Sequence, residues 1–320
     1  MEKVIAAWNL TKEYDGLLAV DHVSFEVNRG EVFGFLGPNG AGKTSTIRML
    51  VGLTEPSEGS ASVAGYDIRK EIVEVKRRVG VVPETSNLYD ELTAGENLLF
   101  ASQLYNVPRG ERPDRIKELL ESFHLTDRRD TKFGKLSRGL KRRVVIAAAL
   151  VHRPEIVFMD EPTTGLDVVS ARSLRKYIQE LQKEGTTVFL TTHYIEEADQ
   201  LADRIALIVK GNIVTVDTPE RIKDKVKGTP IVEAILSREP NRLMVEKLGE
   251  LGSVDWDERR ISITTGNVMV ALESLIHLAK QEGLEVQDIQ TQRPSLEDAF
   301  VELTGISAES MMSEKSRGRR

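Results

Sequence analysis

The sequence predicts an α/β domain built on a mostly parallel sheet, followed by a smaller α+β domain. Three observations lead to this fold class. Over the first two thirds of the chain, short apolar runs alternate with segments of helical periodicity, a pattern typical of parallel strands connected by helices. Several of these runs lack polar alternation, as expected for strands covered on both faces. After Pro219 the pattern changes to a smaller set of short strands and two helices.

The first domain is expected to span residues 1–220. Two runs near its start look like an antiparallel edge layer, at 4–8 and 23–27. The strands of the parallel sheet are expected at 32–36, 79–82, 156–159, 188–190 and 205–209. Helical patterns between these strands include 44–53, 111–123, 140–151 and 171–182, so strands and helices alternate along the domain.

The second domain is expected to span residues 231–305, after a linker over 221–230 in which lysines lead into Gly228, Thr229 and Pro230. Its elements should follow in the order strand, helix, two strands, helix, strand, at 231–236, 242–251, 254–256, 261–264, 268–280 and 284–289. This order is that of the split, ferredoxin-like α+β arrangement. The basic tail, 306–320, is expected to be disordered.

The composition excludes several classes of protein. The chain has 320 residues, a net charge of −6 and no cysteine, which rules out disulfides, thiolate metal sites and cysteine nucleophiles. The acidic balance argues against a general nucleic-acid coat, so no nucleic-acid partner is expected. The apolar runs fall well short of the roughly 20 residues of a membrane-spanning helix, and the N-terminus lacks a signal-peptide pattern. Work at a membrane would therefore need a partner.

The strongest motif is a glycine-rich loop that matches G-x-x-x-x-G-K-[ST] at every position. It follows the predicted strand 32–36 and reads Gly37, Pro38, Asn39, Gly40, Ala41, Gly42, Lys43, Thr44, with Ser45 next. Its glycines let backbone N–H groups turn inward around phosphate oxygens, and the following helix points its positive end at the same place. Lys43 is expected to bind the β- and γ-phosphates of a nucleotide, and the Thr44 hydroxyl to bind Mg²⁺.

A second motif places two adjacent carboxylates at the end of the apolar run 156–159. Asp160 is expected to hold Mg²⁺, directly or through water, and Glu161 to orient or activate the attacking water. Alone, this motif is equally well explained as a strand that runs into an acidic turn. Together with the phosphate loop, it indicates a nucleoside triphosphatase.

Further motifs narrow the family. Residues 136–140, Leu-Ser-Arg-Gly-Leu, resemble the LSGGQ signature of ABC ATPases. Residues 162–167 resemble the D-loop of that family, His193 its switch histidine and Tyr14 its A-loop aromatic residue. The resemblance covers residues 1–220. It implies a P-loop NTPase of the ABC type, with a parallel sheet core, an antiparallel β layer and a helical subdomain, that hydrolyses ATP with Mg²⁺ as cofactor.

The resemblance also implies roles for these residues. Ser137 and Gly139 would bind the γ-phosphate of ATP held by a second subunit, so that two copies, or this chain and a related ATP-binding subunit, form a head-to-tail dimer. Ser137 can equally be read as a simple helix cap. Asp167 is counted with the nucleotide-binding residues, and His193 is expected near the γ-phosphate and Glu161. Tyr14 would stack on adenine, with an ordinary surface turn as the alternative.

Two positions depart from the family pattern. Glu84 stands where the family usually has a glutamine that reaches Mg²⁺, and Arg138 replaces the first glycine of the signature. Glutamate can still bind Mg²⁺, but brings extra negative charge toward the γ-phosphate. The Arg138 side chain either clashes in the site or points to solvent. Because Ser137 and Gly139 remain, a working site is expected.

Two other segments resemble transport ATPases. Residues 84–97 resemble a segment of importer and exporter ATPases whose neighbouring groove receives a coupling helix, with a solvated loop as the alternative. Residues 293–300 resemble the C-terminal extension of drug-exporter ATPases, and Ser295 and Asp298 there form a capping box. We therefore expect the ATP-binding subunit of an ABC transporter of the exporter type. It would be cytoplasmic and peripheral on the inner face of the cell membrane, held by a membrane-spanning permease subunit.

Two other functions stay open. One is a non-transport ABC ATPase that acts on a soluble macromolecular partner such as ribosomes, DNA or a metal-cluster scaffold. Relatives of that kind often carry two ATP domains or a long coiled coil, whereas this chain has one phosphate loop and no heptad run. The other is a module that binds ATP without turnover, against which Glu161 and His193 argue.

Overall fold

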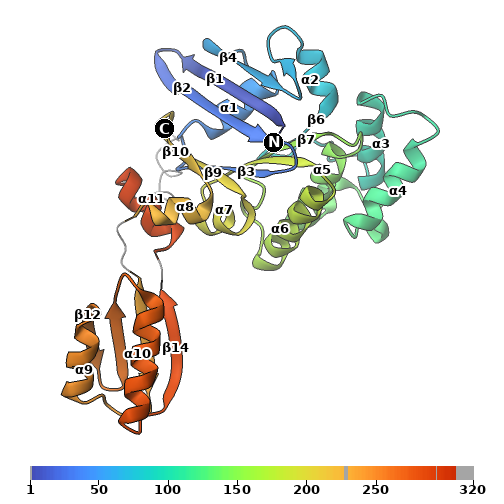
Figure 1. Cartoon of the computed structure of the whole chain (residues 1–320). Coiled ribbons are helices and arrows are strands. Elements are labelled where there is room, and N and C mark those ends of the chain that lie inside the picture. Colours follow the sequence, from blue (N-terminus) through green and yellow to red (C-terminus); the bar gives the residue numbers. More distant parts are fainter. Residues whose placement is uncertain (1, 227–229, 293, 308–320) are drawn as a thin grey trace, which may run out of the picture. The chain divides into compact units, whose positions relative to one another are not determined.

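The computed structural model describes residues 2–226, 230–292 and 294–307 (Figure 1). The expectations for Gly228, Thr229 and the tail from 308 on lie outside these residues. The described chain divides into two compact units. One holds the residues up to Pro219 together with those from Thr304 on, and the other spans Glu220–Leu303.

A six-stranded sheet forms the centre of the first unit. The strand order is β10-β9-β3-β8-β7-β6, and every neighbouring pair is parallel except β10 with β9. The prediction of an α/β fold with a mostly parallel sheet is therefore confirmed. The bounds are β3 Val32–Leu36, β6 Val79–Val82, β7 Ile156–Asp160, β8 Thr187–Thr192, β9 Arg204–Val209 and β10 Asn212–Asp217.

An antiparallel sheet of order β2-β1-β4-β5 accompanies the parallel one. Its strands are β1 Lys3–Tyr14, β2 Leu17–Asn28, β4 Glu58–Val63 and β5 Tyr66–Asp67. The first two are longer than the predicted runs 4–8 and 23–27, because the chain reverses in a tight hairpin. Asp15 and Gly16 have φ of 47° and 82°, the positive values that two-residue turns between twisted strands require.

Helices cover the parallel sheet, and the alternation of side chains along its strands creates two cores. On one face, α1 lies between the two sheets (Figure 1), and Phe33, Phe35, Phe158 and Phe189 pack with β1, β2 and α1. On the other face, residues from α3 to α6 pack against strand residues such as Val157 and Leu190. The helices are α1 Lys43–Leu50, α2 Ile72–Arg78, α3 Ala94–Leu104, α4 Arg112–Ser122, α5 Arg138–Ala149, α6 Val168–Lys183 and α7 Ile195–Leu201.

The second unit has its own core. Its elements follow the order β-α-β-β-α-β, and the antiparallel sheet order is β12-β13-β11-β14. Apolar residues of β11, β13, α9 and α10 form one buried cluster. The bounds are β11 Ile231–Leu236, α9 Arg242–Gly249, β12 Ser253–Asp257, β13 Arg260–Thr264, α10 Val268–Gln281 and β14 Val286–Gln292.

Two helices flank this core in sequence. Helix α8, Pro219–Asp224, occupies the first part of the predicted linker 221–230. The side chain of Ile222, which belongs to this helix, is fully buried. Residues 221–224 are therefore helical rather than linker, because a buried isoleucine follows a proline that favours a helix start. Helix α11, Leu296–Thr304, opens with the predicted capping box. Asp298 N donates to Ser295 Oγ at 3.1 Å, and Ser295 N to Asp298 Oδ2 at 2.9 Å. Among the described helices, none is long and apolar enough to cross a bilayer.

Candidate nucleotide site

The phosphate loop, residues 37–44, connects β3 to α1. Gly37 N donates to Thr192 O of β8 at 3.2 Å, which ties the loop to the carboxyl end of the parallel sheet. Gly42 caps α1 with φ of 102°, and a Cβ there would lie 2.4 Å from Ala19 O of β2. Only glycine fits this position. Because α1 begins at Lys43 and includes Ser45, its free N–H groups face the loop, as in phosphate-binding sites.

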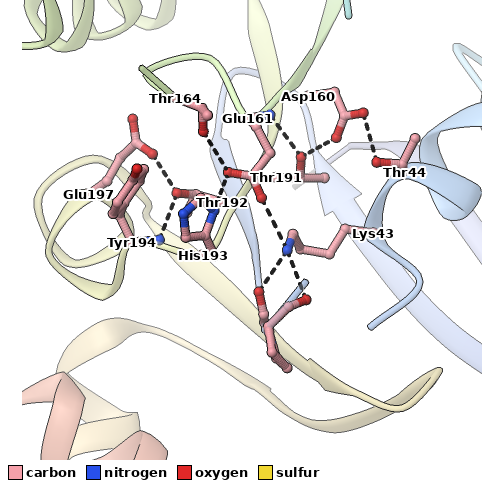
Figure 2. Close-up of polar contacts among 12 residues, drawn as sticks. Lys43, Thr44, Asp160, Glu161, Thr164, Thr191, Thr192, His193, Tyr194 and Glu197 are labelled. Atoms are coloured by element: carbon pink, nitrogen blue, oxygen red, sulfur yellow. Dashed lines mark hydrogen bonds and ion pairs between the residues drawn. The ribbon is translucent and has the colours of Figure 1, made fainter. Parts of the chain in front are cut away.

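Lys43 is folded back over this loop. Its Nζ donates to Gly37 O at 2.7 Å and to Pro38 O at 3.0 Å, and lies 3.1 Å from Glu161 Oε1 (Figure 2). The side chain is 6% exposed. A buried ammonium that shares its donors among two carbonyls and a carboxylate has partners that a phosphate group can replace.

Asp160, the last residue of β7, is held by two hydroxyl groups. Thr44 Oγ1 donates to its Oδ2 at 2.8 Å and Thr191 Oγ1 to its Oδ1 at 2.6 Å (Figure 2). Burial raises the pKa of Asp160, although both hydrogen bonds act in the opposite direction. Hydroxyl and carboxylate oxygens are the ligands that Mg²⁺ takes from proteins, with phosphates and water supplying the rest. The pair Thr44 and Asp160 therefore has the right donors for Mg²⁺ with a nucleotide.

Glu161 lies between the phosphate loop and His193. Its Oε2 accepts from His193 Nδ1 at 2.7 Å and from Thr164 Oγ1 at 3.3 Å, while Lys43 contacts Oε1. Burial is the largest influence on the pKa of Glu161 and raises it. The hydrogen bond from His193 and the charge of Lys43 outweigh burial, so the pKa lies below the usual glutamate value. The carboxylate is therefore ionised at neutral pH.

His193 follows β8 and is 7% exposed. The turn that carries it is fixed by Thr192, whose hydroxyl donates to the Glu197 carboxylate of α7 and accepts from Tyr194 N at 3.0 Å. Burial raises the pKa of Glu197, which favours the protonated form of this acid. The structure thus brings together Lys43, Thr44, Asp160, Glu161 and His193, which lie far apart in the sequence (Figure 2).

Ser137, Gly139 and Asp167 form a second group at the starts of α5 and α6. Ser137 caps α5 through Leu140 N at 3.4 Å, so its structural role is present. Asp167 caps α6 through Ser170 N at 2.8 Å, and that backbone hydrogen bond lowers the pKa of Asp167. A Cβ on Gly139 would lie 2.7 Å from Ser170 Oγ. Asp167 and Gly139 thus both lie close to Ser170, whereas Ser137 bonds within its own helix.

The side chain of Arg138 contacts the D-loop rather than simply pointing to solvent. Its Nη2 donates to Thr164 O of the D-loop at 3.3 Å. The guanidinium Cζ lies 2.0 Å from the position of a Cβ on Gly165, so glycine at 165 leaves the space that Arg138 uses. The extra side chain in the signature therefore joins it to the D-loop of the same chain.

Tyr14 and Glu84 lie at the edges of the site. Tyr14 ends β1 and pairs with Leu17 of β2, just before β2 passes the phosphate loop at Ala19. Its ring is 36% exposed, with Lys12 Nζ 5.0 Å from the ring centroid. Glu84 is exposed and lines a cavity of about 280 Å³ with Arg138, Lys141 and Arg142. It acts on Asp160 through its charge, while Thr44 and Asp160 make the direct contact.

Four residues that were not predicted from the sequence form hydrogen bonds with the site residues or their neighbours. Thr164 bonds Glu161, Thr191 bonds Asp160, and Glu197 bonds Thr192, the residue before His193. Arg142 donates to three carbonyls around Glu161. One signal could have revealed Arg142. It shares a helix face with buried residues three, four and seven positions later, so a charged side chain stands where an apolar one is expected.

The chain is similar to known ATP-binding proteins over most of its length. The ABC transporter family pattern matches residues 20–164. The linearmycin resistance ATP-binding protein LnrL of Bacillus subtilis is 37% identical over 306 residues, covering 94% of this chain and 98% of that protein. The daunorubicin/doxorubicin resistance ATP-binding protein DrrA of Streptomyces peucetius is 37% identical over 319 residues, covering 98% and 96%.

Solved structures agree. An ATP-binding subunit of an ABC transporter superposes with a TM-score of 0.64 at 31% identity, over 69% of this chain and 92% of that one. The dimeric, post-hydrolysis ATP-binding cassette MJ0796 with ADP and Pi gives 0.62 at 28% identity, over 67% and 98%.

The fold and its phosphate loop define a P-loop nucleoside triphosphatase. The similarity to LnrL and DrrA, which extends over nearly the whole chain, narrows the class to one family. The chain belongs to the ABC transporter family, as an ATP-binding subunit that hydrolyses ATP. The family resemblance drawn from the motifs is therefore confirmed.

Proposed function

We propose that this chain drives an ABC exporter, and that Glu161 is its catalytic carboxylate. The observation that carries the assignment of Glu161 is its position between two partners. Its Oε1 lies 3.1 Å from Lys43 Nζ and its Oε2 accepts from His193 Nδ1 at 2.7 Å. A carboxylate next to the cation that binds the terminal phosphate is well placed to take a proton from an attacking water.

The nucleotide would lie on the loop 37–44 and the start of α1. Lys43 would exchange its carbonyl and carboxylate partners for the β- and γ-phosphates. Thr44 and Asp160 would hold Mg²⁺, with Glu84 as the nearest further acid. When bound, the metal neutralises charge on the phosphoryl group. Tyr14 would stack on adenine through its exposed ring face.

The proton steps fall to Glu161 and His193. The pKa of Glu161 lies below its usual range because His193 and Lys43 outweigh burial, so the carboxylate is ready to accept a proton. An ionised carboxylate can only accept hydrogen bonds, so the His193 ring donates from Nδ1. His193 thereby orients the carboxylate, and its Nε2 would donate to the γ-phosphate when that nitrogen also carries a proton. Positioning and charge do most of the catalytic work in such reactions.

The partners follow from the second group of residues and from the relatives. Ser137, Gly139 and Asp167 would contact ATP on a second copy, or on a related subunit, in a head-to-tail dimer. A dimeric post-hydrolysis relative supports this arrangement. Another relative, CbiO1, is part of the transporter complex CbiONQ, in line with a membrane permease as partner.

The curated relatives support the proposed direction of transport. LnrL and DrrA are named for drug resistance, which favours an exporter over a non-transport ATPase with a soluble partner. The chain would lie on the cytoplasmic face of the membrane and contact the permease through the segment 84–97.

Two variants test the site. Glu161→Gln keeps the shape of the side chain but cannot accept a proton. It should bind MgATP within a few fold of wild type and lower kcat at least a hundredfold, about 2.7 kcal/mol in the barrier. Lys43→Ala should instead weaken MgATP binding itself. Lys176→Ala on α6, which is exposed, serves as the control for both, with ATPase assays and equilibrium binding. Rapid turnover by Glu161→Gln would refute the catalytic role.

A further inference from the structure

Arg142 joins α5 to two loops of the catalytic site. Its side chain is buried at 9% exposure. Nε donates to Pro162 O at 2.8 Å and Nη2 to Asp160 O at 3.1 Å, while Nη1 donates to Pro83 O. One guanidinium on the signature helix thus contacts the end of β7, the loop after it and the loop after β6.

Two of these acceptors flank Glu161 in the chain. Glu161 has φ of 47°, a conformation that residues other than glycine keep only where their surroundings hold it. Its N–H donates to Thr191 O at 3.1 Å. Arg142 donates to the carbonyls of Asp160 and Pro162, the two residues that flank Glu161 in the chain. The direction of the Glu161 carboxylate therefore depends on both contacts.

The third acceptor precedes Glu84. Arg142 fixes the carbonyl of Pro83, and the next residue lines the cavity of about 280 Å³ that Arg138, Lys141 and Arg142 also line. The acidic residue that departs from the family pattern thus lies next to a basic cluster on α5. Through Pro83, the Arg142 side chain therefore also fixes the backbone position from which Glu84 extends.

The chemistry of the contact requires arginine. The three acceptors are main-chain carbonyls rather than carboxylates, and burial lowers the pKa of Arg142 to about 10 even though Asp160, Glu197 and Glu84 act in the opposite direction. A buried charge is costly when no carboxylate pairs with it directly. A planar fork of donors can nevertheless reach three carbonyls in fixed directions, which the single ammonium of lysine cannot do.

A second path joins the same helix to Glu161. Arg138 donates to Thr164 O at 3.3 Å, and the Thr164 hydroxyl donates to Glu161 Oε2 at 3.3 Å. Both paths start within the first two turns of α5, which the signature serine caps. A shift of α5 would therefore reach the backbone of Glu161 through Arg142 and its carboxylate through Thr164.

We propose that Arg142 is a positioning residue that fixes the backbone of Glu161 and couples the signature helix to hydrolysis. The inference rests on the proposed catalytic role of Glu161. It predicts that Arg142 affects turnover and leaves nucleotide binding almost untouched, because its three hydrogen bonds go to the carbonyls of Pro83, Asp160 and Pro162 rather than to the phosphate loop.

The test compares Arg142→Met and Arg142→Lys with Arg143→Met in the full-length chain. Arg143 is the neighbour on the same helix and donates to Phe123 O at 3.4 Å, away from the site. Arg142→Met should lower kcat about tenfold to a hundredfold, the scale of a misplaced catalytic group. Affinity for a fluorescent ATP analogue with Mg²⁺ should stay within about threefold, and Arg143→Met should match wild type. Arg142→Lys keeps the charge without the fork, so its kcat should lie nearer to that of Arg142→Met.

A double variant separates positioning from general stability. In the Glu161→Gln background, Arg142→Met should cause no further loss in single-turnover rate, because the group that it positions is already inactive. An equal further loss, or wild-type turnover in Arg142→Met, would overturn the inference. If Arg142→Met does not fold, Arg142→Lys carries the same comparison. Full turnover by Glu161→Gln would instead refute the proposed function itself.

Discussion

At the scale of single residues, the site keeps four ionisable side chains in a space that excludes most water. Lys43, Asp160, Glu161 and His193 are all buried, and each has a different kind of partner. Carbonyls hold the lysine and hydroxyls hold the aspartate. The glutamate lies between the Lys43 ammonium and the His193 ring. Because low exposure strengthens these interactions, a small displacement of one group alters the others.

A histidine outside this cluster gives a pH prediction. His152 stacks on Tyr105 with ring centroids 3.8 Å apart, and its Nε2 bonds Val79 O at 3.1 Å. Burial lowers the pKa of His152 from 6.5 to about 4. Between these values the unfolded chain binds more protons than the folded one, so stability falls as the pH falls.

His152→Phe keeps the aromatic stack and removes the titrating group. Wild type should lose about 2 kcal/mol more unfolding free energy than the variant between pH 7 and pH 5. Denaturant unfolding of both proteins at the two pH values measures the difference. If wild type and variant lose the same unfolding free energy between the two pH values, His152 does not take up a proton on unfolding in this range.

At the scale of elements, buried strands could be predicted and half-buried ones could not. β3 and β6 have their predicted bounds, and β7, β8 and β9 extend the predicted runs by one to three residues, because uninterrupted apolar residues mark strands covered on both faces. β10 was missed, since its side chains are half-buried or exposed. The motifs at 37–44 and 160–161 could be predicted because their residues are consecutive in the sequence. The contacts of Arg142 were not, because they join residues 83, 142, 160 and 162 only in the folded chain.

The segment 84–97 is more ordered than a solvated loop. Asn97 of α3 is fully buried, accepts from Tyr89 N at 3.0 Å and donates to Tyr89 O and Thr93 O at 3.0 Å. Thr93 and Glu96 form a capping box at the start of α3. Leu88 packs against the helical core, whereas Tyr89 is 50% exposed. Tyr89 is therefore the side chain of the two that a partner can reach.

Tyr89→Glu should release the membrane subunit and leave ATPase activity of the isolated chain within about twofold, since an exposed substitution away from the site has little effect on it. Val73→Glu on α2, at an equally exposed apolar position, is the matched control. Capture of the permease from detergent extract, beside the ATPase assay, measures both effects. Retained capture with lost activity would place Tyr89 in the catalytic machinery.

At the scale of the whole molecule, the two units each have a separate core. Both clusters of the first unit draw their fully buried residues from positions 4 to 208, and the cluster of the second unit from 232 to 284. A chain that ends at Pro219 should therefore fold and bind MgATP within a few fold of the full chain, since its cores stay complete. Thermal unfolding and nucleotide binding, with a chain that ends at residue 307 as control, test this. Loss of cooperative unfolding would show that the first unit needs residues after Pro219.

The same division gives the protein two natural optical probes. It has two tryptophans, Trp8 in β1 of the first unit and Trp256 in β12 of the second, which are 49% and 42% exposed. Trp8→Phe leaves tryptophan fluorescence from the second unit alone, and Trp256→Phe leaves it from the first. Emission curves from these two variants, recorded against denaturant, therefore read each unit by itself in the intact chain, and coincident midpoints would mean that the units unfold as one.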